Sequence, residues 1–306
     1  MHQDYYSNGK LLLSGEYAIL DGATGLAVPT KYGQSLTITA TSSGVLQWTS
    51  FTEKNSVWFR GSFSLEDLTV ISTTDDTISK TLVALLSEAK SQNSAFLENN
   101  NGLSVQTHLN FPRDWGLGSS STLINNLAQW AKIDPYKLLW NAFGGSGYDI
   151  ACAQHNTPIF YQMANGVPEV KEVLFDPPFK DAIHFVYLNQ KQSSKEAITS
   201  YRKQHLDKQH LVTKISAFTK KIATTTSLSE FESFMEQHEE LLSKTLGLPT
   251  IKSKLFKDFP GAIKSLGAWG GDFVMVTCAK ENTDYFKSKG YKIIIPYIQM
   301  VHSSIA

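Results

Sequence analysis

Residues 113–122 read RDWGLGSSST, and this segment constrains the fold more than any other part of the chain. The preceding residues GLSVQTHLNFP alternate apolar with polar side chains and end at Pro112, which is typical of a strand. The following residues LINNLAQWAK have the apolar spacing of a helix. The sequence therefore predicts a strand, a glycine turn and a helix start, because glycine permits backbone turns that other residues avoid.

Two interpretations of this segment remain open when it is taken alone. The serines can cap the helix, as serine and threonine do in many helices that bind nothing. Alternatively, the glycines and the positive end of the helix can cradle a phosphate group. The segment is neither a Walker A loop nor a dinucleotide fingerprint, because the lysine of the first and the third glycine of the second are missing. By itself the segment favours the cap.

Composition excludes several classes of protein. The 306 residues are 42% apolar and carry 28 basic against 28 acidic side chains, so no basic excess points to nucleic acid. The apolar runs are too short to span a bilayer, and the first residues lack the pattern of a secretion signal. Cys152 and Cys278 form no framework and suit a reducing compartment. A soluble cytoplasmic protein, with no nucleic-acid or membrane partner, is expected.

The order of the predicted elements indicates two α+β domains. Strands are expected at SLTITATSS, GVLQWTSF and SVWFRGSFS, and a helix over 77–92. The second half has helical patterns at 193–204, 211–225 and 228–247, the last with a capping box at Ser229–Glu232. Two prolines in FDPPFK mark the boundary, which gives domains 1–175 and 180–306.

Three further stretches contain glycines beside polar side chains. FGGSGYDIACA, 143–153, places an aspartate after a glycine turn, either as a helix cap or as a base beside a phosphate. KSLGAWGGDF, 264–273, reads as a tight turn before a strand, and NGKLLLSGEYAIL, 8–20, as a strand with a solvent-facing lysine. His238–Glu239 lacks the second histidine of a zinc helix, so no metal site is expected there.

Together and in this order, the four stretches resemble the motifs of the GHMP kinases, the superfamily named for galactokinase, homoserine kinase, mevalonate kinase and phosphomevalonate kinase. The resemblance covers almost the whole chain. It implies a ribosomal-S5-like N-terminal domain and a ferredoxin-like C-terminal domain. Tyr17 after Gly-Glu, the run GSGYDIA and the ending Gly-Gly-Asp are most similar to the phosphomevalonate kinase branch.

The resemblance implies that the chain uses ATP and Mg²⁺. Asp149 matches the family's catalytic aspartate and Lys10 its active-site lysine, with Ser120 as the Mg²⁺ ligand. The residues that would cradle the ATP phosphates are Gly116, Leu117, Gly118, Ser119, Ser120 and Ser121. The candidates for contact with the acceptor are Glu16, Tyr17, Ser146, Lys191 and Ser194, and the C-terminal glycine motif consists of Gly267, Gly270 and Gly271.

Three positions depart from the family pattern. Leu138 stands where mevalonate kinases carry a second metal-binding glutamate, which counts against that branch. Trp269 lies inside the C-terminal glycine motif, where an indole would narrow the site, and Trp115 precedes the first glycine of the phosphate loop. Thr122, at a position where the family often has alanine, is a mild change.

The expected function is ATP-dependent phosphorylation of a small anionic metabolite, with phosphomevalonate as the first candidate acceptor. Mevalonate kinase or another small-molecule kinase of the same superfamily is the nearest alternative. A non-catalytic nucleotide-binding sensor is the alternative from another class, favoured by Leu138 and Trp269. A diphosphomevalonate-type decarboxylase shares the fold but matches these motifs less well. The expected assembly is a monomer or a homodimer.

Overall fold

The structure is a computed structural model that describes residues 2–98, 101–190, 198–199, 201–203, 207–267, 269 and 271–302. The chain divides into two compact units, each assembled from separate segments. Unit 1 comprises Met1–Gly9, Tyr32–Arg113 and Leu117–Gln154, and unit 2 comprises Lys10–Lys31, Asp114–Gly116 and His155–Ala306. The predicted boundary at 175–180 falls within unit 2, and it stays a prediction.

Two long strands contribute to both units. β1 (His2–Ser14) enters unit 2 at Lys10, and β2 (Gly25–Ala40) leaves unit 2 after Lys31. In unit 1 the strands lie in the order β5-β4-β3-β6-β2. The strands that join β2 in this order are β3 (Val45–Phe51), β4 (Val57–Ser64), β5 (Val70–Thr73) and β6 (Leu103–Leu109). Only the β3–β6 pair in this order is parallel, and the alternating side chains predicted for these strands give the sheet a buried face.

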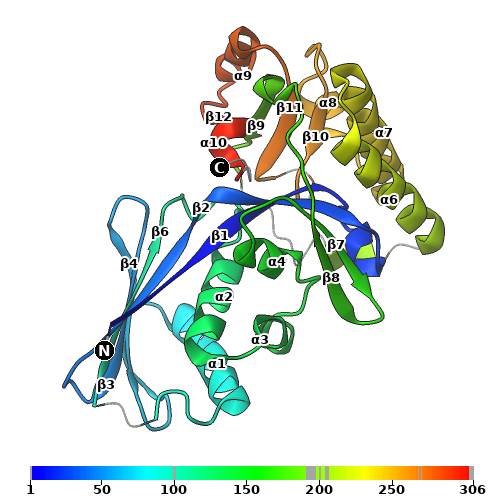
Figure 1. Cartoon of the computed structure of the whole chain (residues 1–306). Helices are drawn as coiled ribbons and strands as arrows, with labels where there is room; N and C mark the ends of the chain where they lie inside the picture. Colours follow the sequence, from blue (N-terminus) through cyan, green and yellow to red (C-terminus); the bar gives the residue numbers. More distant parts are fainter. Residues whose placement is uncertain are drawn as a thin grey trace. The chain divides into compact units, whose positions relative to one another are not determined.

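The helices of unit 1 pack on that face, as Figure 1 shows. They are α1 (Asp76–Gln92), α2 (Ser119–Ala131), α3 (Pro135–Ala142) and α4 (Tyr148–Gln154). Asp75 caps α1 by accepting hydrogen bonds from the N–H groups of Thr77 and Ile78. Leu82, Leu85 and Leu86 are buried, so the helix predicted over 77–92 is confirmed.

Unit 2 contains β7 (Ile159–Ala164) and β8 (Val167–Glu172), with β7 paired to the first residues of β2. It also holds an antiparallel sheet in the order β10-β11-β9-β12. These strands are β9 (Ile183–Tyr187), β10 (Ile263–Ser265), β11 (Phe273–Thr277) and β12 (Ile294–Pro296). The strand predicted to follow the glycine motif is therefore confirmed as β11.

Helices cover this second sheet. The longest, α6 (Lys208–Thr224) and α7 (Leu228–Leu246), lie side by side in Figure 1. The others are α8 (Ile251–Leu255), α9 (Asp284–Ser288) and α10 (Tyr297–Met300), with the 3₁₀ turns η1 (Ala18–Asp21), η2 (Lys180–Ala182) and η3 (Lys280–Thr283). Among the helices within the described ranges, none is both long and apolar enough to cross a membrane.

The capping box predicted at Ser229–Glu232 is wrong by half a turn. The N-cap of α7 is Ser227, whose hydroxyl accepts from the Glu230 N–H. Ser227 has the extended backbone of a cap (φ −100°, ψ 124°), whereas Ser229 already lies inside the helix. Both pairs fit the same sequence pattern, so only the backbone conformation distinguishes them. The predicted α+β class is confirmed.

Candidate functional site

The start of α2 lies in unit 1 and is capped by a glycine. Gly118 is the N-cap in a left-handed conformation (φ 89°), and no side chain accepts from the first N–H groups. The first N–H groups of an α-helix have no intrahelical partner and carry the positive end of the helix dipole. A serine cap, the alternative interpretation of this segment, is thus not what the structure has. The start of α2 therefore presents backbone N–H groups that can donate hydrogen bonds to an anion.

The hydroxyl groups of this segment fall into two classes. Ser121 donates to the Gly118 carbonyl (3.0 Å), and Thr122 donates to Gln34 Oε1 (2.8 Å), so both are used within unit 1. Ser119 is half-buried and Ser120 is exposed, and no hydrogen bond to a described residue engages either hydroxyl. These two side chains therefore remain available to a ligand at the helix start.

Residues 114–116, which precede α2, belong to unit 2 and are fixed there by aromatic packing. The Trp115 ring lies edge-on against Phe273 (5.5 Å between centroids) and tilted against Tyr187 (6.4 Å). The Tyr187 hydroxyl donates to the Asp114 carbonyl at 3.1 Å. The tryptophan that departs from the family pattern therefore anchors this segment on β9 and β11.

Lys10 meets this segment at Gly116. The half-buried Lys10 ammonium donates to the Gly116 carbonyl at 2.9 Å. Gly116 has φ 66°, and a Cβ there would lie 2.3 Å from Oδ2 of Asp272. Asp272 is held by backbone hydrogen bonds to Leu188 and Gln190. Unit 2 thus brings together three of the four motif stretches: β1, the phosphate-loop start and the C-terminal glycine motif.

Asp149 lies in the first turn of α4 and is half-buried. The preceding glycines 144, 145 and 147 all have positive φ, so the loop that carries Ser146 needs glycine to turn. α4 packs against α2 within unit 1. Burial raises the pKa of Tyr136, and the charges of Cys152, Asp134 and Asp149 add to this effect. Unit 1 therefore places the predicted catalytic aspartate and the free serines on neighbouring helices.

Glu16 and Tyr17 form the elbow between β1 and η1. Gly15 (φ 114°) and Tyr17 (φ 61°) both have positive φ, and a Cβ at Gly15 would lie 2.7 Å from the Gly25 Cα. Glu16 is 1% exposed and accepts a short hydrogen bond from the Lys264 ammonium. All the contacts found for Glu16 among the described residues are inside unit 2.

Sequence reasoning did not find the partners of Glu16. Lys264, His238 and Glu239 are each no more than 2% exposed, and with Glu16 they form what is called here the buried polar cluster. His238 Nε2 lies 3.4 Å from Glu16 Oε2, and the Ser265 hydroxyl donates to Glu239 at 3.2 Å. The only available signal is that Lys264 lies on a strand directly after the apolar residues Ala262 and Ile263.

Burial controls the protonation of this cluster. It raises the pKa of Glu239 to about 8, against the opposing pull of Lys264, and it raises the pKa of Glu16 as well. Burial and then the Lys264 charge hold the pKa of His238 well below its usual range. These shifts favour a protonated Glu239 and an uncharged His238 near neutral pH. By position, Glu16 is the carboxylate that contacts Lys264.

The indole of Trp269 is taken up by packing in unit 2. It is 7% exposed among Tyr17, Tyr201 and residues of α6 and α7, and its Nε1 donates to the Pro249 carbonyl at 3.2 Å. The Trp269 N–H donates to the Tyr17 hydroxyl at 2.9 Å. The indole side chain that was expected to narrow the site is instead part of a hydrophobic cluster.

The remaining candidate positions differ in what can be described. Leu138 is fully buried in the core of unit 1, so the position where mevalonate kinases carry glutamate serves packing. Gly267 has φ 68° with open space around it, and Gly271 is buried just before Asp272. Lys191, Ser194 and Gly270 lie outside the described residues.

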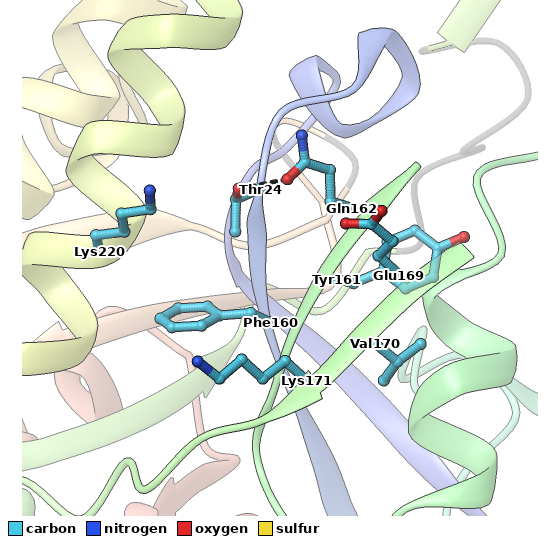
Figure 2. A pocket seen from close by; sticks show the side chains of 8 residues that line it. All are labelled: Thr24, Phe160, Tyr161, Gln162, Glu169, Val170, Lys171 and Lys220. Atoms are coloured by element: carbon cyan, nitrogen blue, oxygen red, sulfur yellow. Dashed lines mark hydrogen bonds between the residues drawn. The ribbon is translucent and has the colours of Figure 1, made fainter. Parts of the chain in front are cut away.

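A hollow of about 460 Å³ in unit 2 contains none of these motif residues. Figure 2 shows Lys220 of α6 and Lys171 of β8 beside the ring of Phe160, with Thr24 donating to Gln162. Concave sites are the usual first candidates for ligand binding. Because no motif residue lines this hollow, we do not assign the reaction to it.

Metal ligands are sparse among the residues that the structure describes. No group of three His, Cys, Asp or Glu side chains is arranged there to hold a metal ion. Mg²⁺ bound with nucleotide phosphates needs few protein ligands, because phosphate oxygens and water complete its coordination. The exposed Ser120 hydroxyl at the helix start fits such a role.

No protein-family model and no curated protein matches the chain. Solved structures match it over nearly its whole length. Mevalonate kinase of Methanococcus jannaschii has a TM-score of 0.69 at 16% identity, covering 96% of this chain and 97% of that one. Phosphomevalonate kinase of Streptococcus pneumoniae, solved with phosphomevalonate and AMPPNP, has 0.69 at 15%, covering 94% and 95%.

Galactokinase of Lactococcus lactis, solved with galactose, has a TM-score of 0.67 at 13% identity, covering 99% of this chain and 94% of that chain. At such low identities the likenesses establish the fold alone. The predicted architecture is confirmed by them.

Proposed function

We propose that this chain, which has the fold of the GHMP kinases, transfers the γ-phosphoryl group of ATP to a small-molecule acceptor. The observation that carries the proposal is the start of α2. Its cap is a left-handed glycine, its first N–H groups have no side-chain cap, and two of its serine hydroxyls are unengaged by described residues. Such a helix start is suited to an anion with several oxygens.

The roles of the individual residues follow from this placement. Residues Gly116 to Ser121 cradle the ATP phosphates, with Ser120 as a ligand of Mg²⁺, which would neutralise phosphate charge when bound. Lys10 offsets the charge that develops on the transferred group. Its hydrogen bond to the Gly116 carbonyl holds the ammonium beside the segment that enters the phosphate loop.

Asp149 has a role that depends on the acceptor. With a hydroxyl acceptor the carboxylate removes the proton as the oxygen attacks phosphorus. With a phosphate acceptor, which is already ionised at neutral pH, no proton needs to be removed, and Asp149 would instead orient the metal when it is bound. The acceptor therefore decides how much of the rate depends on this side chain.

Phosphomevalonate is the acceptor we propose first. The run GSGYDIA and the Gly-Gly-Asp ending support that branch, and the buried Leu138 leaves no second carboxylate of the mevalonate kinase type at that position. One of the solved structures of similar fold binds phosphomevalonate. Mevalonate and sugars are the competing acceptors, since kinases acting on them share the fold equally well.

The test is coupled ADP release by the purified protein with Mg-ATP and phosphomevalonate, mevalonate or galactose in parallel. Turnover with phosphomevalonate alone is expected. Turnover with mevalonate alone would move the chain to the other branch and show that it functions without a glutamate at 138. ATP binding without turnover on any acceptor would overturn the kinase proposal in favour of a nucleotide sensor.

A further inference from the structure

The buried polar cluster joins segments that are far apart in the sequence. Glu16 lies on the elbow after β1, His238 and Glu239 on α7, and Lys264 on β10. Glu16 and Lys264 are separated by 248 positions. Both side chains are essentially inaccessible to solvent, so neither can contact a substrate in this arrangement. Any effect of Lys264 on a reaction must pass through other residues.

One ion pair links two elements of the cluster. Lys264 is the only lysine of the cluster, and its ammonium donates to Glu16. Lys264 also donates to the Ser265 carbonyl at 3.0 Å. A buried ion pair resists separation, because removing one partner leaves an uncompensated charge away from water. The pair therefore holds the elbow firmly against β10.

Each end of this pair leads to the candidate site within unit 2. From Glu16, β1 runs back to Lys10, whose ammonium contacts the Gly116 carbonyl. From Lys264, the chain runs through the glycine motif to Asp272, which lies against Gly116. The Tyr17 hydroxyl and the Trp269 N–H connect the two paths midway. Together these contacts connect the Glu16–Lys264 pair to Gly116 from both sides.

We propose that Lys264 is a positioning residue: its buried ion pair with Glu16 fixes the end of β1 against the glycine motif and thereby sets the place of the Lys10 ammonium at Gly116. The kinetic part of this inference rests on the proposed kinase function. The structural part, a mechanical link between residues 10–20 and 263–273, does not. Lys264 thus serves the reaction without touching the reactants.

A purely structural role for Lys264 predicts a different result. In that case its removal lowers stability, but the folded molecules that remain work normally. Misplacement of a catalytic group by about 1 Å can cost on the order of 100-fold in rate. The two roles are therefore separated by measuring turnover per folded molecule.

The experiment compares Lys264→Met with Lys252→Met. The control removes the surface ion pair between Lys252 and Glu236 (2.8 Å), whose side chains are 27% and 48% exposed. Hydrogen exchange by mass spectrometry is read over residues 10–20 and 263–273. Turnover and the dissociation constant for Mg-AMPPNP are measured on protein that circular dichroism shows to be folded.

For Lys264→Met we expect faster exchange in both segments, turnover lower by about 100-fold and a nucleotide dissociation constant changed less than about threefold. Lys252→Met should match the wild type in all three. Faster exchange at 263–273 alone, or normal turnover by the folded variant, would overturn the proposal. If Lys264→Met does not fold, Glu16→Gln, which removes the charge but keeps an acceptor, should show the same pattern with smaller changes.

Failure of the proposed function can be recognised separately. If the wild-type protein turns over no acceptor, the kinase proposal fails, and the exchange measurement still decides whether Lys264 links the two segments. If the wild type is active and Lys264→Met loses nothing but stability, the kinase proposal stands and the positioning role is refuted.

Discussion

The start of α2 in unit 1 and the buried polar cluster in unit 2 use polar side chains in opposite ways. At the start of α2, Ser119, Ser120 and the first N–H groups are left without partners among the described residues. In the cluster, Glu16 and Lys264 form an ion pair away from water, and only one of the two Glu16 oxygens accepts a hydrogen bond there. The polar groups at the start of α2 are therefore available to a ligand, whereas those of the cluster hold backbone segments together.

This difference separates two kinds of polar residue that a sequence presents alike. Substitutions of groups without protein partners, as at the start of α2, should change ligand binding or turnover with little loss of stability. Substitutions of buried and paired groups, as in the buried polar cluster, should first change stability and the motion of the backbone. Four experiments test whether this separation holds, beginning with the largest expected effect.

Asp149→Asn should lower turnover by about 100-fold or more with a hydroxyl acceptor, because the amide cannot take a proton. The melting temperature and the nucleotide dissociation constant should stay nearly unchanged, since Asp149 is half-buried. Steady-state kinetics and calorimetry measure these quantities. Asp134→Asn is the control, because asparagine also caps α3 at that position. Near-normal turnover of Asp149→Asn with a hydroxyl acceptor would remove Asp149 from proton transfer.

Gly116→Ala should lower the free energy of unfolding by more than about 2 kcal/mol. Alanine is strained in the left-handed backbone of this position, and its methyl group would clash with Asp272. Gly144→Ala, at φ 75° with open space around it, carries the backbone cost alone. Urea unfolding of both variants isolates the steric part. Equal losses in the two variants would mean that Asp272 moves aside without cost.

Glu239→Gln should flatten the dependence of stability on pH. The folded protein keeps a proton on Glu239 up to about pH 8, whereas an unfolded glutamate has lost it near pH 4.3. The folded state binds more protons in between, so its stability falls as pH rises and this contribution is lost beyond pH 8.

Between pH 6.5 and 8 this contribution amounts to at most about 2 kcal/mol. Thermal unfolding of wild type and Glu239→Gln at both pH values measures the difference. Glu16, Lys264 and His238, the ionisable groups that face Glu239, are the same in the two proteins. A wild-type curve parallel to that of the variant would show that Glu239 is already ionised at neutral pH.

The smallest effects should come from two adjacent serines. Ser120→Ala should weaken Mg-ATP binding by roughly 0.5–1.5 kcal/mol and leave the melting temperature alone, because its hydroxyl is exposed. Ser121→Ala should lower the melting temperature and leave Mg-ATP binding nearly unchanged. It removes a buried hydroxyl that donates to the Gly118 carbonyl but keeps the backbone N–H, through which Ser121 can still bind phosphate. Calorimetric titration and thermal unfolding on both variants complete the test. The same response from both serines would contradict the distinction between polar groups that lack a protein partner and those that are buried and paired.

The sequence predicts the fold best where one local signal dominates. The helix over 77–92 has a clear apolar stripe, and the strand–turn–helix around 113–122 is punctuated by a proline and glycines. Prediction fails where two local signals compete, as at α7, where Ser227 and Ser229 each stand three residues before a glutamate. There the backbone of the preceding turn decides.

The candidate site is predictable only in its exposed part. Lys10 and Asp149 come from motif resemblance, and their roles stay predictions. The burial of Lys264 and Glu239 cannot be predicted from local sequence, because it depends on partners supplied by distant segments. Trp269 reads as an obstacle in a glycine turn, although the packing of α6 and α7 gives it a hydrophobic site.

The distance along the chain between Glu16 and Lys264 has a consequence for biosynthesis. A ribosome adds roughly 5–20 residues per second, so Lys264 is made roughly 12 to 50 s after Glu16. During that interval the carboxylate must stay hydrated, and the elbow cannot close. The start of α2, by contrast, needs only the neighbouring segments of unit 1, and these are all synthesised before Lys264. The nascent chain therefore carries its phosphate-loop helix before the lysine that anchors β1 exists.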